Sequence, residues 1–262
     1  MTAYAATAQK ANANPSKSFF IQMLTRDIDL VDCILDLLDN SVDGITQKAK
    51  RLGEKLDEEL PFAGYAVDIT FDKNSFSIHD RSGGIPINIA QEYAFRFGRP
   101  DDAPALNEGS IGLYGIGMKR AIFKMGNLVK MASSTGSESF ELVLDVNEWR
   151  HNPQVAKAAD GEEFMEWAFD LSNVQREGTD QAEGTSIHIE ELYENIQRQF
   201  DNPIFRDRMI RMISRDYAFI LNRGLQVTVN GVAVAAVMPV FRESPDIAPF
   251  KHAETIDGVR IE

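Results

Sequence analysis

Apolar residues recur every three or four positions over one long stretch near the start of the chain. This stripe consists of Ile28, Val31, Leu35, Leu38, Val42 and Ile45. Because an α-helix repeats every 3.6 residues, the spacing places these side chains on one helical face. We therefore predict a long amphipathic helix here, followed by a solvated segment at 48–59. The small and polar residues 1–18 predict a mobile N-terminal arm before it.

Elsewhere apolar and polar residues alternate, which is typical of β-strands with one buried face. Two such runs, 67–71 and 76–78, flank the turn-forming residues 72–74 and predict a β-hairpin. Further strands are predicted at 128–132, 140–146, 164–170, 185–190 and from 225 onward, and helices at 89–97, 118–125 and 206–221. This mixture predicts an α+β fold or α/β sandwich, with helices on one face of a mostly antiparallel sheet.

Composition and charge narrow the class of protein. The 262 residues include 40 acidic and 27 basic side chains, a formal net charge of −13, and 16 phenylalanines, which together indicate a folded acidic protein. Bulk acidity argues against binding nucleic acid through net charge. The single cysteine, Cys33, excludes an internal disulfide and multi-cysteine metal sites and permits a reducing, cytoplasmic location. The longest apolar run, 232–241, is interrupted by Pro239 and is far shorter than the roughly 20 residues of a membrane span, so no membrane association is predicted.

A second face of the long helix carries polar groups, namely Asp29, Asp32, Asp36, Asn40 and Asp43. One interpretation is a solvated surface, because like charges at this spacing repel by only about a few tenths of a kcal/mol per pair. The other is a site in which Asn40 supplies one oxygen to Mg²⁺ and Asp36, one turn earlier, accepts a proton from water. Mg²⁺ suits such a site because it usually takes only one or two protein oxygens. The pattern alone leaves both open.

The segment Asp80-Arg81-Ser82-Gly83-Gly84-Ile85 follows the predicted hairpin. It could be a tight turn that needs glycine. Alternatively, Asp80 could accept a hydrogen bond from an exocyclic amine such as that of adenine, with glycine letting a flat ring approach the backbone.

A third segment, Gly112-Leu113-Tyr114-Gly115-Ile116-Gly117-Met118-Lys119, precedes a predicted helix. Its backbone N–H groups could converge on a phosphate at the helix N-terminus, with charge added by Lys119, or it could be a glycine-rich packing loop. The glycine order and the absence of Gly-Lys-Ser/Thr exclude a Rossmann fingerprint and a P-loop. The pair Gly184-Thr185, which opens a strand, is weak evidence by itself.

Taken in order, these four segments resemble the nucleotide-binding boxes of the GHKL ATPase superfamily, which includes DNA gyrase B subunits, ninety-kilodalton heat-shock chaperones, histidine kinases and MutL. The resemblance covers residues 19–222 and implies a Bergerat-type ATP-binding fold with a mixed, largely antiparallel sheet under helices. It implies a mobile lid over the nucleotide at 91–111. The sequence Phe97-Gly98-Arg99 and the position of Lys119 are most similar to MORC-like and MutL-like members.

The resemblance also assigns roles to residues. It implies that Asp36 is the hydrolytic base, that Asn40 binds Mg²⁺ and that Asp80 reads the adenine amine. The nucleotide-binding set that it implies is Asn40, Asp80, Gly84, Ile85, Gly112, Leu113, Tyr114, Gly115, Ile116, Gly117, Met118, Lys119 and Thr185. Two positions depart from the family pattern, because Asp36 stands where the base is normally glutamate and Ser82 replaces the first glycine of its box.

The function expected from this resemblance is Mg²⁺-dependent ATP binding with slow hydrolysis that drives an ATP-gated dimer clamp, in a DNA-related or defence process. The alternatives are a non-hydrolysing ATP- or ADP-sensing module and a chaperone-like ATPase. A DNA or protein partner would bind through a domain outside this chain. The expected organisation is an arm at 1–18, an ATP-binding domain at 19–222 and the start of a β-rich, transducer-like segment at 223–262.

Overall fold

An eight-stranded mixed sheet forms the centre of the protein. The computed structural model describes residues 15–53, 59–98, 116–151, 155–157, 161, 163–165, 167–239, 252–256 and 259–261. The sheet order is β10-β9-β1-β2-β8-β3-β4-β7. Its strands are β1 Ala66–Phe71, β2 Phe76–Asp80, β3 Gly126–Ser134, β4 Ser139–Asp145, β7 Leu171–Gln175, β8 Gly184–Leu192, β9 Gln226–Val229 and β10 Val232–Ala233. Only the β1–β9 pairing within this sheet is parallel.

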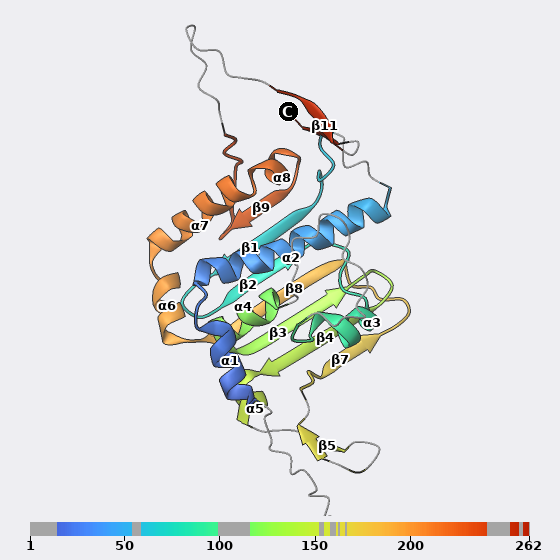
Figure 1. The fold of residues 1–262 in the computed structure, drawn as a ribbon, viewed down its shortest axis with the longest axis vertical. Helices are drawn as coiled ribbons and strands as arrows, with labels where there is room; N and C mark the ends of the chain where they lie inside the picture. Colours follow the sequence, from blue (N-terminus) through green and yellow to red (C-terminus); the bar gives the residue numbers. More distant parts are fainter. Residues whose placement is uncertain are drawn as a thin grey trace, which may run out of the picture.

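Helices α1, α2 and α4 lie together over one face of this sheet (Figure 1). The helical segments are α1 Lys17–Thr25, α2 Leu30–Arg51, α3 Ile87–Ile89, the π-helical η1 Ala90–Ala94, α4 Gly117–Met125, α5 Val146–His151, α6 Glu194–Phe200, α7 Pro203–Asp216 and α8 Ala218–Asn222. The predicted fold class, a largely antiparallel mixed sheet with helices, is confirmed. Among the residues that the structure describes, no helix is both long and apolar enough to cross a membrane.

Helix α2 is the predicted amphipathic helix. Val31, Leu38, Val42 and Ile45 from the apolar stripe are buried in the hydrophobic core between the helices and the sheet. Burial of such side chains contributes about 1.5–3 kcal/mol each, which explains why this face of the helix is fixed against the sheet. Its polar face is thereby directed away from the core, toward the side on which α4 packs.

The predicted hairpin is formed by β1 and β2. Residues Phe71 and Phe76 pair at its turn, where Asp72 accepts hydrogen bonds from the backbone N–H groups of Asn74 and Ser75. Phe76, Ile78 and Asp80 alternate on the buried face of β2. The last of these core-facing positions is therefore an acid, which is an unfavourable choice for a core unless the acid has partners.

Several elements differ from the predicted ones. Of the predicted strand 164–170, only residues 164 and 165 lie in a strand, β6 Glu163–Met165, which pairs with β5 Val155–Lys157 outside the main sheet. Residues 167–170 are not in a strand, and β7 begins at Leu171. The predicted helix 206–221 is interrupted at Tyr217, between α7 and α8. Helix α1 begins within the residues predicted to form the arm, and residues 1–14 lie outside the described part of the chain.

The main sheet extends beyond residue 222. Strand β9 pairs in parallel with β1, and β10 pairs with β9. Val227 and Val229 of β9 are buried in the same core as α2. A separate two-stranded sheet follows, formed by β11 Glu254–Ile256 and β12 Val259–Ile261.

Candidate functional site

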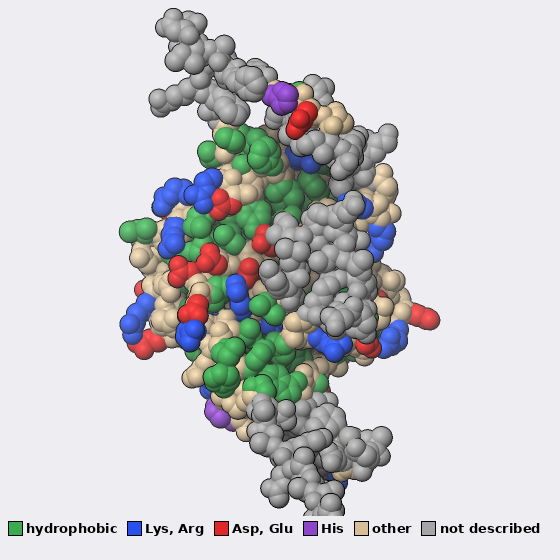
Figure 2. Space-filling view, in the orientation of Figure 1, with side chains coloured by type: hydrophobic (Ala, Val, Ile, Leu, Met, Phe, Trp, Pro, Cys, Tyr) green, Lys and Arg blue, Asp and Glu red, His purple; other side chains and the backbone are tan. Residues whose placement is uncertain are grey.

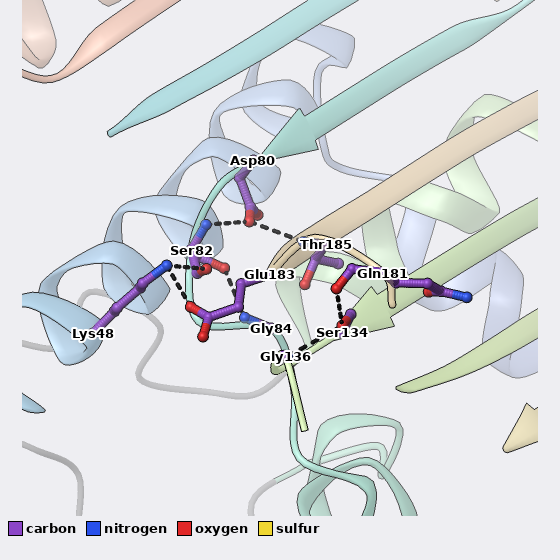
Figure 3. Close-up of polar contacts among 9 residues, drawn as sticks. All are labelled: Lys48, Asp80, Ser82, Gly84, Ser134, Gly136, Gln181, Glu183 and Thr185. Atoms are coloured by element: carbon purple, nitrogen blue, oxygen red, sulfur yellow. Dashed lines mark hydrogen bonds and ion pairs between the residues drawn. The ribbon is translucent and has the colours of Figure 1, made fainter. Parts of the chain in front are cut away.

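The carboxylate of Asp80 lies at the centre of the candidate site. It is 5% exposed and accepts three hydrogen bonds from separate parts of the described chain. Oδ2 accepts from the hydroxyl of Ser41 on α2 at 3.0 Å. Oδ1 accepts from the backbone N–H groups of Ser82 at 2.9 Å and Thr185 at 3.0 Å (Figure 3). A carboxylate offers about four lone-pair positions. These three bonds hold Asp80 firmly and leave acceptor capacity for one more donor.

The loop after β2 needs glycine at one position. Gly84 has φ +64°, and a Cβ built on it would lie 2.0 Å from the carbonyl oxygen of Ser134. The next residue, Ile85, donates its backbone N–H to the hydroxyl of Ser133 at 2.8 Å, and that hydroxyl hydrogen bonds with the hydroxyl of Thr185 at 3.1 Å. The structure thus brings Asp80, Gly84, Ile85 and Thr185 together across the ends of β2, β3 and β8.

Ser82 replaces a glycine of the family pattern and has a clear role here. Its side chain is buried, and its hydroxyl accepts the backbone N–H of Gly84 at 3.3 Å. Its carbonyl accepts a hydrogen bond of 3.3 Å from Lys48, whose ammonium also lies 2.5 Å from Glu183 (Figure 3). The end of α2 is therefore bonded both to this loop and to the segment before β8.

On α2, Asn40 and Asp36 lie one turn apart and are joined by a hydrogen bond. The amide nitrogen of Asn40 donates to the backbone carbonyl of Asp36 at 2.7 Å. The donor end of the amide is thereby used, and the oxygen of this exposed side chain is the end that can bind a cation. Among the described residues, no group of three or more His, Cys, Asp or Glu could hold a metal ion. Mg²⁺ remains compatible, because it needs only one or two protein oxygens.

The carboxylate of Asp36 lies between α2 and α4. Nη2 of Arg120 lies 3.2 Å from Oδ2 of Asp36. Partial burial raises the pKa of Asp36, while Arg120 opposes this rise. The carboxylate of Asp36 is therefore paired with the guanidinium of Arg120 in a partly buried position, which suits a proton acceptor.

Asp39, the other acid near Asn40, has a structural contact. Its Oδ1 accepts a hydrogen bond from the hydroxyl of Tyr217, which also donates to the carbonyl of Leu35 at 3.3 Å. Burial raises the pKa of Asp39. The contact joins α2 to the junction of α7 and α8. A surface pocket of about 420 Å³, lined in part by Phe219 and Ile220, lies beside it.

Part of the predicted phosphate-binding segment can be located. Ile116 is the N-cap residue of α4, and Gly117, Met118 and Lys119 form its first turn, whereas Gly112, Leu113, Tyr114 and Gly115 lie outside the described residues. The side chain of Lys119 is 2% exposed, and its ammonium donates to the carbonyl of Ala94 at 2.8 Å. Burial lowers the pKa of Lys119 to about 8. In this structure Lys119 is therefore hydrogen-bonded to the backbone of η1, which lies at the start of the predicted lid.

Sequence reasoning missed three participants, namely Ser41, Lys48 and Arg120. The first follows Asn40 on α2 and could have been noticed as a polar residue on the inner side of that helix. The polar contacts of the other two with Ser82, Glu183 and Asp36 span 34 or more positions, and no local pattern indicates such contacts.

The fold and this site define a class of protein: an α+β domain with an acid at a strand end, an amide on the facing helix and a glycine-rich segment before a second helix. Residues 28–179 match the family model described as Histidine kinase-, DNA gyrase B-, and HSP90-like ATPase. This match covers more than half of the chain, and the protein belongs to that family. No curated protein matches the chain. ATP binding and ATP hydrolysis are the general activities of the family.

Proposed function

We propose that this domain binds Mg²⁺-ATP between α2, α4 and the ends of β2, β3 and β8, and hydrolyses it slowly. The observation that carries this proposal is the buried carboxylate of Asp80, which three protein donors fix at the core-facing end of a strand. A buried charge is costly, and a structural turn would not require one.

The arrangement around Asp80 favours adenine over guanine. The remaining acceptor capacity of Asp80 suits the exocyclic amine of adenine, whereas guanine presents a carbonyl oxygen at the equivalent position, which a carboxylate repels. Gly84 lets the loop after β2 pack directly against the backbone of Ser134, and Ile85 and Thr185 complete the proposed base-binding set. An unmet hydrogen bond in such a site costs about 1–3 kcal/mol, enough to discriminate between the two bases.

The phosphates are assigned to the opposite end of the site. Asn40 would supply an oxygen to Mg²⁺, which when bound neutralises phosphate charge. The N–H groups at the start of α4, from Gly117 and Met118, and residues 112–115 would contact the phosphates. Asp36 would accept a proton from the attacking water. The water oxygen would bond to the γ-phosphorus as the bond between the γ-phosphorus and the bridging oxygen breaks and ADP leaves. Lys119 would add charge to the phosphates after leaving the carbonyl of Ala94.

The ATP-gated dimer clamp is the larger-scale part of the proposal. Its support is a ring cluster that joins α1 to the start of the lid: Phe97 lies 4.9 Å from the ring of Phe20 on α1 and 5.8 Å from that of Trp167. Apolar side chains gather at the lower end of the molecule, near α1 and α5 (Figure 2), and Phe19 and Met23 of α1 are more than half exposed. A lid that closes over ATP would move Phe97 and thereby reorient an apolar helix surface that a second copy could cover.

The MORC-like and MutL-like character, and with it a DNA-related or defence process in an intracellular setting, rests on sequence resemblance. A DNA or protein partner acting through a further domain is proposed on the same basis. A chaperone-like ATPase would share the nucleotide site and differ in the partner that it binds.

A non-hydrolysing ATP sensor is the second candidate. The observation that favours it is Asp36 itself, whose side chain is one methylene shorter than that of glutamate. Such a module would bind Mg²⁺-ATP and release no phosphate.

Calorimetry and phosphate release together test these proposals. We expect ATP to bind in the presence of Mg²⁺, GTP to bind at least about tenfold more weakly, and phosphate to be released slowly over multiple turnovers. Binding without phosphate release would support the sensor and contradict the ATPase. Equal affinity for ATP and GTP would contradict the role of Asp80.

A further inference from the structure

Two residues of the first turn of α4, Gly117 and Arg120, lie close to the carboxylate of Asp36. A Cβ on Gly117 would lie 3.2 Å from Cγ and 3.2 Å from Oδ2 of Asp36, so α4 approaches the acid at this glycine. Three residues along the same helix, Arg120 brings its Nη2 to 3.2 Å from the same Oδ2. The two helices therefore meet at this carboxylate.

Arg120 is itself held in place. Its backbone N–H donates to the carbonyl of Ile116 at 2.8 Å, which fixes it in the first turn of α4. About a third of its side chain is exposed, and its Nε is buried without a partner among the described residues. A guanidinium with a buried, unpartnered nitrogen is costly, so the contact with Asp36 is the interaction that compensates for its position.

We propose that Arg120 is a positioning residue that fixes the carboxylate of Asp36 for attack of water on ATP. This inference rests on the proposed ATP hydrolysis. Arg120 holds Oδ2, which leaves Oδ1 of Asp36 to accept the proton from water. An aspartate side chain has one rotatable bond fewer than glutamate and is shorter. A misplaced Asp36 carboxylate therefore cannot extend toward the attacking water, and a neighbouring residue must hold it in the right orientation.

The size of the expected effect follows from geometry. Displacement of a reacting group by about 1 Å costs on the order of a hundredfold in rate. Loss of the Arg120 contact frees one torsion of Asp36 but leaves Asp80, Asn40 and the rest of the site intact. The effect should therefore fall on kcat, with little change in nucleotide binding.

The first experiment compares Arg120→Met, Arg120→Lys and Lys124→Met with the wild type. Lys124 is the matched control, because it lies on the same helix and donates to the carbonyl of Thr25, away from Asp36. We expect Arg120→Met to lower kcat at least about tenfold, with KM and the affinity for a non-hydrolysable ATP analogue changed less than about threefold. Arg120→Lys, which retains a donor cation, should recover most of the rate, and Lys124→Met should keep kcat within about twofold.

The second experiment repeats Arg120→Met in an Asp36→Asn background. If Arg120 acts through Asp36, it should cause no further loss of kcat there, whereas a general structural defect would lower the rate in both backgrounds. An unchanged or raised kcat in Arg120→Met alone, a parallel loss of analogue binding, or an additive loss in the double variant would each overturn the proposal. Absence of turnover in the wild type would overturn the proposed hydrolysis and this inference together, whereas turnover that Arg120→Met leaves intact would overturn this inference alone.

Discussion

The backbone N–H of Thr185 donates a 3.0 Å hydrogen bond to Oδ1 of Asp80, although 105 residues separate the two in the sequence. The contact is possible because Gly184, with φ +146°, lets β8 approach so closely that a Cβ there would lie 2.1 Å from the carbonyl oxygen of Asp80. The Gly-Thr pair that opens β8 therefore holds the carboxylate of Asp80 through its backbone, while the threonine hydroxyl hydrogen bonds with Ser133.

The replacement Asp80→Asn should weaken both ATP binding and the fold. Asparagine keeps one acceptor oxygen but turns an NH₂ group toward donors from Ser41, Ser82 or Thr185. We expect at least about a tenfold loss of ATP affinity and a decrease of about 1–3 kcal/mol in the free energy of unfolding. Calorimetry and urea denaturation measure the two effects. Ser41→Ala, which removes one donor and keeps the carboxylate, should be milder in both, and an Asp80→Asn variant that binds ATP normally would contradict the site.

Gly84→Ala should be far more harmful than Gly83→Ala. The first combines a positive φ with a 2.0 Å overlap against the carbonyl of Ser134, which is backbone and cannot move aside. The second meets Nη2 of Arg51 at 3.0 Å, the end of a flexible side chain. We expect Gly84→Ala to lower the free energy of unfolding by at least about 1–3 kcal/mol and Gly83→Ala by less than about 1 kcal/mol. Similar unfolding midpoints for the two variants would show that the loop is not held as described.

Asp36→Asn should abolish most turnover and leave ATP bound. The amide retains the shape of the side chain but cannot accept the proton from water, so kcat should fall by about 10²–10⁴-fold. Asp32→Asn provides the control, because Asp32 is exposed one turn earlier on the same helix. Phosphate release measures the rate, and calorimetry measures binding. Equal rates in Asp36→Asn and the wild type would remove Asp36 from the mechanism.

Lys119 should make stability depend on alkaline pH. Its pKa is about 8 in the folded protein and ordinarily 10.5, so between these values the unfolded chain binds more protons. Stability therefore rises with pH across this window, by up to about 1.4 kcal/mol per pH unit. Below pH 8 the folded protein carries the full cost of the buried charge.

The variant Lys119→Met lacks this titration. We expect the wild type to gain stability relative to Lys119→Met as the pH rises from 8 to 10, measured by urea denaturation at matched ionic strength. A constant difference between the two proteins over this range would show that the ammonium is hydrated in the folded state, contrary to its 2% exposure.

Elements with one buried face were predictable from the sequence, and contacts between distant segments were not. The stripe of α2 and the alternation of β1 and β2 are local signals of one-sided burial. The end of α7 at Tyr217 has no local breaker, and that residue bonds Asp39 on another helix. Strand β7 was not predicted, because its residues are almost entirely exposed and give no alternation of apolar and polar positions.

The same distinction applies to the site. Recognisable motifs contain Asp36, Asn40, Asp80 and Gly84. The roles of Arg120 and Lys48 were not predictable from the sequence, because their partners are distant in the chain. A lysine in a charged stretch at the end of a helix is ordinarily solvated. Only the fold shows that Lys48 reaches Ser82 and Glu183.

The parallel pairing of β9 with β1 has a consequence for any shortened form of the protein. Residues 226–229 cover the backbone N–H and C=O groups along one side of Ala66–Ile69. A fragment that stops at residue 222 would leave those groups unpaired beside two apolar side chains, Val67 and Ile69. Such an edge readily recruits another strand, so the fragment would be prone to self-association even with every proposed nucleotide-binding residue in place.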